Sequence, residues 1–298
     1  MLPRESQNNN MMPRPSRSMP LTVGSRTFAL NQRAVLMGIV NVTPDSFSDG
    51  GLYFEPQAAL QQALDLAAAG ADILDIGGES TRPFSEPVPL QEELQRVIPL
   101  IQAIRRHSDI PISIDTYKAA VAQAALAAGA NLINDISALR FDPLMVQVAA
   151  AANVPVVLMH MQGEPRNMQL APHYDNLIAE VKTFLAERRN YALAHGIARH
   201  NIILDVGIGF GKNLTHNLEL IRRLHEFHDL GCPLLLGVSR KAFIGSLLNA
   251  PVTERDIGTL GAIAVGLIRG AQIIRTHNVH LAKQLITVIN AVLHGPKI

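Results

Sequence analysis

The strongest constraint on the fold of this 298-residue chain is a repeat of eight short apolar runs, each followed by a longer segment with a helical pattern. The runs are rich in β-branched residues and have the length of strands. They span residues 34–40, 72–76, 111–114, 131–133, 154–159, 201–204, 233–238 and 271–274. Because alternating strands and helices form parallel sheets, and eight such units close naturally on themselves, the pattern predicts an α/β fold, a single-domain (β/α)8 TIM barrel. A doubly wound open sheet is the alternative architecture.

Several of the intervening segments carry recognisable helix ends. The predicted starts are Pro56, Thr116, Asp142 and Asp175, and the predicted ends are Gly70, Gly129 and Gly196. The segment 90–106 has an apolar face but contains Pro99, so we expect either a kink or a late helix start there.

Each apolar run ends in polar residues. These are Asn41, the stretch 79–82, Asp115, Asn134 and Asp135, His160, Asp205, the stretch 239–241 and the stretch 275–277. One Asn or Asp after a strand is ordinary turn or cap chemistry. Eight polar ends that together supply carboxylates, an amide, a Lys, an Arg and a His are different, because the carboxyl ends of barrel strands converge on one mouth. The pattern therefore indicates an enzyme with its site at that mouth.

Composition limits the classes of protein to which the chain can belong. Apolar residues make up 48% and charged residues 17%, enough for a sizeable core, and the net charge of +1 indicates neither a nucleic-acid nor a membrane-surface partner. No apolar run approaches the roughly 20 residues that span a bilayer. Cys232 is the only cysteine, which excludes an intramolecular disulfide and a Cys-based zinc site and is consistent with the cytoplasm. Residues 1–19 are polar and aperiodic, and we expect a disordered tail before a barrel domain at 20–298.

Two segments have the character of functional loops. Residues 41–51, NVTPDSFSDGG, form a connection longer than is usual after a barrel strand, and residues 79–83, ESTRP, add a cation and a rigid proline. Long loops at a barrel mouth are often lids.

The glycine-rich segment 205–212 resembles a phosphate loop only superficially. A Walker A motif would require Gly at 206 and Ser or Thr at 213, where this chain has Val206 and Asn213. A dinucleotide fingerprint fails because Lys212 stands where its third glycine belongs. The glycines are therefore interpreted as allowing a tight turn or a close approach of backbone to a flat ligand.

Cationic residues follow the last two runs. From chemistry alone, Lys241 could be a Schiff-base nucleophile, a contact for an anion or carbonyl, or a solvated residue of a first helical turn. Arg275 and His277 lie two positions apart and could contact one anion, and phosphate sites in this fold favour these two loops. A bound diphosphate is therefore expected. Any metal should be a hard cation such as Mg²⁺, held by few protein oxygens and by phosphates of the substrate.

Read together, the segments resemble the dihydropteroate synthases, in family order from about residue 20 to the C-terminus. The matching stretches are MGIVNVTPDSFSDGG (37–51), DILDIGGESTRP (72–83), ISIDTYK (112–118), LINDIS (132–137), LMHMQGEP (158–165), DVGIGFGKNLTHN (205–217), LLLGVSRKAFIG (236–245) and GAQIIRTHNV (270–279). The resemblance implies a transferase of folate biosynthesis. It would join (7,8-dihydropterin-6-yl)methyl diphosphate to 4-aminobenzoate, giving 7,8-dihydropteroate and diphosphate.

The resemblance also implies roles for particular residues. Those expected to hold the pterin are Asp115, Asn134, Asp205 and Lys241, with Met159 and Phe210 packed near the ring. Those expected at the diphosphate are Arg275 and His277, with Asn41 as the protein contact of Mg²⁺. Those expected around the aminobenzoate and the two loops are Phe47, Thr81, Arg82, Pro83 and Ser239. Catalytic roles are implied for Asp45, Arg82, Lys241, Arg275 and His277, with Asp45 stabilising a pterin-methyl cation. The resemblance further suggests a homodimer formed through outer helices.

The chain departs from the family pattern at two positions and leaves other functions open. Val206 stands where the family usually has Pro, and Phe84 where it has Gly; Phe84 affects the expected shape of the second loop. The alternatives are a pterin-binding methyltransferase of the corrinoid type, a non-catalytic pterin-binding paralogue, and an aldolase using Lys241 as a Schiff base.

Overall fold

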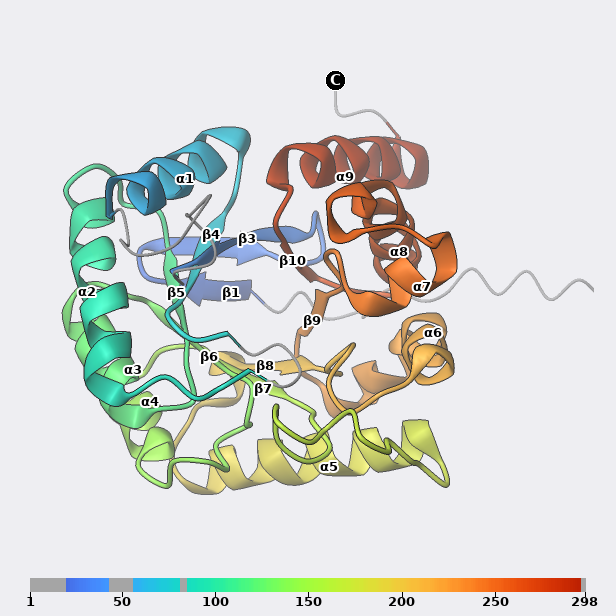
Figure 1. Cartoon of the computed structure of the whole chain (residues 1–298), viewed down its shortest axis with the longest axis horizontal. Helices are drawn as coiled ribbons and strands as arrows, with labels where there is room; N and C mark the ends of the chain where they lie inside the picture. Colours follow the sequence, from blue (N-terminus) through green and yellow to red (C-terminus); the bar gives the residue numbers. More distant parts are fainter. Residues whose placement is uncertain (1–19, 43–55, 81–84, 296–298) are drawn as a thin grey trace, which may run out of the picture.

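Eight parallel strands close into a barrel in the computed structural model, which describes residues 20–42, 56–80 and 85–295 (Figure 1). The strands follow one another around the barrel in chain order, with β10 paired to β3. They are β3 (Val35–Asn41), β4 (Ile73–Gly77), β5 (Ile112–Asp115), β6 (Leu132–Asp135), β7 (Val156–Met159), β8 (Ile202–Asp205), β9 (Leu234–Gly237) and β10 (Ile273–Thr276). The predicted barrel is confirmed, and the open sheet is excluded.

The polar residues expected just after the runs are, in several strands, the last residues of the strands themselves. Asn41, Asp115 and Asp205 each end a strand, and Asn134 lies one position before the end of β6. The hydrogen bonds between neighbouring strands are made by backbone groups, so a strand can continue through a position that carries a polar side chain. These side chains therefore follow the alternation of the strand, which decides whether each points into the barrel or outward.

That alternation produces two separate apolar layers. Inward-facing residues such as Met37, Ile73 and Leu235 fill the lower interior of the barrel. Outward-facing residues such as Leu74 and Leu236 pack against the surrounding helices. Burial on both faces explains why the strands read as nearly continuous apolar runs.

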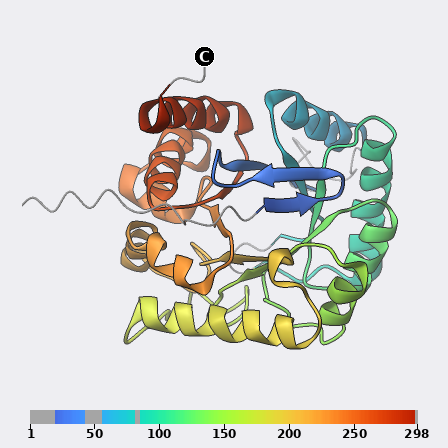
Figure 2. The same ribbon diagram turned by 180° about the vertical axis from the view of Figure 1, so that it is seen from behind.

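An antiparallel hairpin, β1 (Pro20–Val23) and β2 (Arg26–Ala29), lies across the N-terminal end of the barrel (Figure 2). Leu21, Val23 and Phe28 belong to the same buried cluster as the inward-facing residues of the strands. The hairpin thus covers an apolar interior that would otherwise meet water. The sequence does not predict this hairpin, because two four-residue strands carry too short an alternating pattern to be distinguished from an irregular segment.

The helices form the outer layer. They are α1 (Pro56–Ala69), α2 (Leu90–Arg105), α3 (Ala119–Ala127), α4 (Met145–Ala152), α5 (Leu177–Ala194), α6 (Leu214–Arg222), α7 (Ala242–Leu248), α8 (Asp256–Ile268) and α9 (Val279–His294), with short 3-10 turns at Arg199–Asn201, Leu224–Leu230 and Val252–Glu254. Among the described residues, none of these helices has both the length and the apolar character needed to cross a bilayer.

Three predicted helix starts were wrong in detail. Thr116 does not cap α3: its hydroxyl accepts from the Lys118 amide, whereas Asp142 of the following segment accepts from the amide of Ala119 at 2.8 Å. The cap of α5 is Asn176, one residue later than predicted, and α4 begins at Met145 rather than directly after Asp142. Helix α2 begins at Leu90 with Pro99 inside it, which excludes the late start that was one of the two possibilities for this segment. A cap depends on which side chain reaches the first amides, and a neighbouring segment can supply it.

Candidate active site

The upper interior of the barrel is polar where the lower interior is apolar. We call the group formed by Asp75, Asp115, Asn134, Asp205, Lys241 and Arg275 the polar cup. The carboxylates and the amide are at most 8% exposed. Their strand positions alternate with residues of the outer apolar layer, such as Ile76, Ile114 and Leu204, so they face inward. Residues from five strands and one strand-to-helix loop therefore meet in one place.

Arg275 crosses the interior and joins two carboxylates. Its Nε atom lies 2.5 Å from Oδ2 of Asp75, and a terminal nitrogen lies 2.6 Å from Oδ2 of Asp115. Asn134 donates from Nδ2 to the same Asp75 oxygen at 3.2 Å. Side chains of β4, β5 and β10 are thereby connected through one guanidinium group, which suits two carboxylates because its donors form a rigid fork. Asp75 adds the side chain of Asn134 from β6.

Asp75 is the site residue that sequence reasoning missed. It lies in the middle of the run 72–76 and was taken as part of a strand, although a carboxylate within a buried run is itself a signal. It is fully buried, and its position in register with Ser113 places it one inward-facing residue below Asp115. Its partners come from strands that are far away in the sequence, so no local pattern could identify them.

Asp205 and Lys241 form the opposite side of the polar cup. Asp205 accepts from the Gly207 amide at 2.8 Å, and Lys241 donates to the carbonyl oxygen of Ile208. The Lys241 ammonium also lies 4.7 Å from the centre of the Phe210 ring. The loop that follows β8 therefore brings a carboxylate, a cation and a flat apolar surface together.

Burial changes the protonation of these groups in predictable directions. It raises the pKa of Asp115 to about 7, an effect that the Arg275 guanidinium opposes. It raises the pKa of Asp205 as well, with Lys241 opposing, and it lowers the pKa of Lys241 to about 8 although Asp205 stabilises its charge. The Lys241 ammonium and the Asp115 carboxyl are thus poised to change charge near neutral pH.

The glycines after β8 serve a tight turn, as one of the two interpretations of the sequence held. Gly207 has a φ of +69°, and an added Cβ would lie 1.8 Å from the carbonyl oxygen of His160. Gly211 has a φ of +62°, and an added Cβ would lie 2.7 Å from the carbonyl oxygen of Gln162. Lys212 is 2% exposed, and its ammonium contacts His160 Nδ1 and the Phe210 carbonyl oxygen, both at 2.9 Å. Lys212 therefore fastens this loop to the end of β7 rather than binding a phosphate.

An apolar patch lies beside the polar cup. Met159 and Phe210, both predicted to pack against a ring, belong to one cluster with Ile136, Met161 and Met168. The structure brings Met159 and Phe210 together although 51 positions separate them in the sequence. A flat ligand could therefore rest on sulfur and aromatic surface while its polar edge meets the cup.

Ser239 and His277 are direct neighbours at the ends of β9 and β10. The hydroxyl of Ser239 lies 2.8 Å from Nδ1 of His277 and accepts from the His277 amide at 3.1 Å. Ser239 was assigned to the aminobenzoate by resemblance, and the structure places it against a residue assigned to the diphosphate. A hydroxyl in contact with the imidazole fixes the orientation of the ring.

Several predicted site residues cannot be placed. Asp45, Phe47, Thr81, Arg82, Pro83 and Phe84 lie outside the described residues, as does the tail 1–19. Asn41 ends β3 and is half-buried. The base of the second loop is described: Glu79 accepts from Tyr117 at 2.6 Å and pairs with Lys118, which also contacts the buried Glu93. This network anchors the chain just before residue 81.

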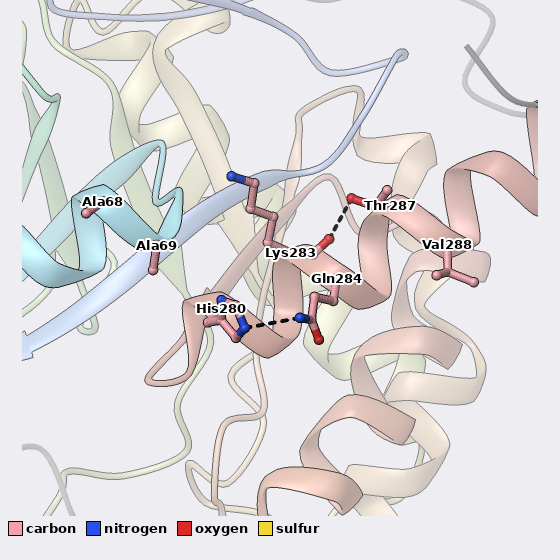
Figure 3. Close-up of a pocket in the computed structure, with 7 residues that line it drawn as sticks. All are labelled: Ala68, Ala69, His280, Lys283, Gln284, Thr287 and Val288. Carbon is pink, nitrogen blue, oxygen red and sulfur yellow. Dashed lines mark hydrogen bonds between the residues drawn. The ribbon is translucent and has the colours of Figure 1, made fainter. Parts of the chain in front are cut away.

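A separate groove lies on the outside of the barrel (Figure 3). It is lined by Ala68, Ala69, His280, Lys283, Gln284, Thr287 and Val288, from the end of α1 and along α9. No residue of the polar cup lines it. The groove is therefore distinct from the candidate active site.

The fold and the polar cup define the class of protein. A closed (β/α)8 barrel with charged and amide side chains at the carboxyl ends of its strands is the arrangement of a small-molecule enzyme. The family model described as "Pterin binding enzyme" matches residues 37–277, which include every described residue of the cup.

Comparison with individual proteins narrows the class. The dihydropteroate synthase of Synechocystis sp. is 46% identical over 273 residues, which cover 91% of this chain and 94% of that relative. The structure of Xanthomonas albilineans dihydropteroate synthase with 4-aminobenzoic acid has a TM-score of 0.88 and 45% identity, and covers 94% of this chain and 100% of its own. That enzyme in complex with 7,8-dihydropteroate has a TM-score of 0.84 and 43% identity over 93% of this chain and 100% of its own. The chain belongs to the pterin-binding enzyme family and, within it, to the dihydropteroate synthases.

Proposed function

We propose that the protein joins (7,8-dihydropterin-6-yl)methyl diphosphate to 4-aminobenzoate, releasing diphosphate and forming 7,8-dihydropteroate for folate biosynthesis. The observation that carries the proposal is the polar cup, in which Asp115, Asn134, Asp205, Lys241 and Arg275 meet inside one barrel. The solved relatives with 4-aminobenzoic acid and with 7,8-dihydropteroate support these substrates.

The chemistry of the cup suits a pterin. The amino-pyrimidinone edge of a pterin presents adjacent N–H donors, which a carboxylate such as Asp205 can accept as a pair. Asn134 can both donate and accept, and Lys241 can donate to the ring carbonyl. Met159 and Phe210 supply the apolar surface for the ring faces. A buried site of this kind rejects analogues that lack the matching groups, because its own polar atoms would remain unpaired.

The diphosphate would lie toward Arg275 and His277, at the strand ends where this fold commonly holds phosphates. Asn41 at the end of β3 offers an amide oxygen, a hard donor of the kind that suits Mg²⁺ when most of its other ligands are phosphate oxygens and water. When bound, Mg²⁺ would neutralise negative charge on the diphosphate. Asn41 is the residue of this chain that would hold it.

The proposed reaction is a dissociative substitution. The bond between the pterin methyl carbon and the diphosphate oxygen breaks, and the electron pair leaves on oxygen. The nitrogen of the aminobenzoate then bonds to that carbon and loses a proton. Arg275 and His277 stabilise the departing charge, and Asp45 and Arg82 of the two loops act on the cation and the arylamine. A neutral arylamine is nucleophilic at pH 7, so no strong general base is required.

The decisive experiment supplies both substrates and Mg²⁺ and measures diphosphate and 7,8-dihydropteroate. Formation of product that requires both substrates supports the proposal, and the absence of product contradicts it.

Binding of methyltetrahydrofolate but not of the pterin diphosphate would instead indicate a methyltransferase of the corrinoid type. Pterin binding without turnover would indicate a non-catalytic paralogue, and borohydride trapping of Lys241 with a carbonyl substrate would indicate an aldolase.

Pterin affinity is expected to depend on pH with a maximum between about 7 and 8. The Asp115 carboxylate forms as the pH rises through its pKa of about 7, and the Lys241 ammonium is lost as the pH rises through its pKa of about 8. Both charged partners are present together only between those values. Calorimetry across this range measures the effect, and Asp115→Asn should remove the rising limb but keep the fall at higher pH. Equal affinity on both sides of the window would contradict the assignment.

We also propose that the protein works in the cytoplasm as a homodimer formed through outer helices. Helices α7, α8 and α9 lie beside one another in the C-terminal part of the chain (Figure 1). Large apolar side chains are exposed on them, among them Leu247, Ile257 and Val292. Ile257 is 83% exposed, which favours a surface that a second copy covers. Ile257→Asp is expected to shift the protein to monomers in sedimentation experiments, whereas Ile110→Val in the core should leave the oligomeric state unchanged.

A further inference from the structure

Asp75 carries a set of contacts that the proposed roles of the other cup residues do not explain. Its Oδ2 atom accepts from Arg275 Nε at 2.5 Å and from Asn134 Nδ2 at 3.2 Å. Its other oxygen, Oδ1, is buried and has no hydrogen-bond partner among the described residues. A buried carboxylate is costly to desolvate, and an ion pair in its place is seldom more stable than well-packed apolar groups. Stability alone is therefore a poor explanation for a charge at this position.

The two carboxylates that hold Arg275 lie at different depths. Asp115 ends β5 and is paired in register with Gly77, whereas Asp75 is paired with Ser113, two residues further from the mouth. A ligand that comes in through the mouth therefore meets Asp115 before Asp75. Asp115 can accept from a pterin through Oδ1, which is buried and has no hydrogen-bond partner among the described residues. A diphosphate that enters through the mouth reaches the terminal nitrogen of Arg275, held by the shallower carboxylate, before it reaches the Nε held by Asp75. The contact of Asp75 with Nε lies deeper and is not in the path of that ligand.

Asp75 also determines how Asn134 faces the ligand. A carboxylate only accepts hydrogen bonds, so the amide must turn its nitrogen toward Asp75. The carbonyl oxygen of Asn134 is then directed away from Asp75. The same carboxylate thus orients one residue assigned to the pterin and one assigned to the diphosphate.

We propose that Asp75 is a positioning residue that keeps hold of Arg275 Nε throughout the cycle, while the terminal nitrogen of Arg275 exchanges Asp115 for the diphosphate of the substrate. Asp75 acts through Arg275 and does not touch the reacting atoms. This inference rests on the proposed function. In this proposal Asp115 is the exchangeable partner of Arg275 and Asp75 is the permanent one. The guanidinium therefore stays fixed at Nε, and only its terminal nitrogen changes partner when the substrate binds.

A double-mutant cycle of Asp75→Asn and Arg275→Ala tests the proposal. Asp75→Asn keeps the shape of the side chain and removes its charge, and it is expected to lower kcat by about 100-fold, the scale of a misplaced catalytic group. In the Arg275→Ala background the same change should alter kcat by less than about 3-fold, because the arginine through which Asp75 acts on the departing charge is already absent. The remaining contact with Asn134 acts on pterin binding, and its loss should appear in KM rather than in kcat. If the losses of kcat caused by the two single substitutions multiply in the double variant, the proposal is overturned.

The matched control is Asp72→Asn. Asp72 begins the same run of β4, pairs with Arg33 through both carboxylate oxygens at 2.6 and 2.7 Å, and lies toward the opposite end of the barrel from the polar cup. This variant should change thermal stability with kcat within about 2-fold of the native value. A loss of kcat equal to that of Asp75→Asn would mean that any damage to β4 has this effect, and would overturn the proposal.

Binding of inorganic diphosphate gives a readout that does not depend on turnover. Calorimetry with this probe should show weaker binding in Asp75→Asn and no further weakening when Arg275 is already Ala; additive losses would overturn the inference. If Asp75→Asn does not fold, the Nε–H resonance of Arg275 in the native protein serves instead. It should stay protected from solvent exchange when diphosphate saturates the site, and loss of protection would overturn the inference. Absence of dihydropteroate formation by the native chain would contradict the proposed function separately from either result.

Discussion

Replacing Asp205 with alanine is expected to weaken binding of the pterin diphosphate by about 100- to 1000-fold. The native carboxylate is buried and would accept two adjacent N–H groups of the pterin, and each hydrogen bond to a charged group contributes about 1.5–3 kcal/mol. The variant also leaves the Lys241 ammonium without the carboxylate that stabilises its charge, so the pKa of Lys241 should fall below its native value of about 8. Both effects weaken binding of the pterin diphosphate.

Calorimetric titration of the native and Asp205→Ala proteins measures this effect. Asp229→Ala is a suitable control, because Asp229 is exposed, pairs with Lys182 on the surface and lies outside the cup. Its removal should leave pterin affinity unchanged. Unchanged affinity in Asp205→Ala itself would mean that the pterin does not bind in the polar cup.

Arg275→Ala is expected to lower kcat by about 100- to 1000-fold, the loss that follows removal of one group stabilising transition-state charge. The guanidinium contacts two carboxylates of the polar cup, Asp75 and Asp115. Without it these buried groups lose their counter-charge, and the pKa of Asp115 should rise further, since Arg275 opposes its upward shift. Breaking a buried pair by removing one partner costs about 3–5 kcal/mol of stability at pH values where the carboxylates stay ionised.

Steady-state kinetics test the expected loss of kcat, and denaturant unfolding at two pH values tests the expected loss of stability. The loss of stability should be smaller at a pH below the pKa of Asp115, because a protonated carboxyl needs no counter-charge. Arg275→Lys should not restore kcat, since an ammonium lacks the fork that spans two carboxylates. Arg33→Ala, which breaks the Asp72 pair, should leave kcat unchanged. An Arg275→Ala protein with native kcat would exclude the proposed role.

The local features of this protein could be read from its sequence. Strand period, β-branched composition and helix ends predicted the barrel, and every strand lies within two residues of its predicted run. The same pattern located Asp115, Asn134 and Asp205 at strand ends. These features depend on residues that are neighbours in the chain, and short-range sterics and hydrogen bonding decide them.

Tertiary structure decided the rest. The covering hairpin, the cap of α3 by Asp142, the contact of Ser239 with His277 and the bond between Arg275 and Asp75 all join residues brought together by closure of the barrel. Closure and the stagger between strands determine which inward-facing residues share a level, and neither is encoded in the period of any single strand. The sequence thus determined which polar residues end the strands, whereas only the closed barrel determined that Arg275 reaches across the interior to a carboxylate 200 positions away.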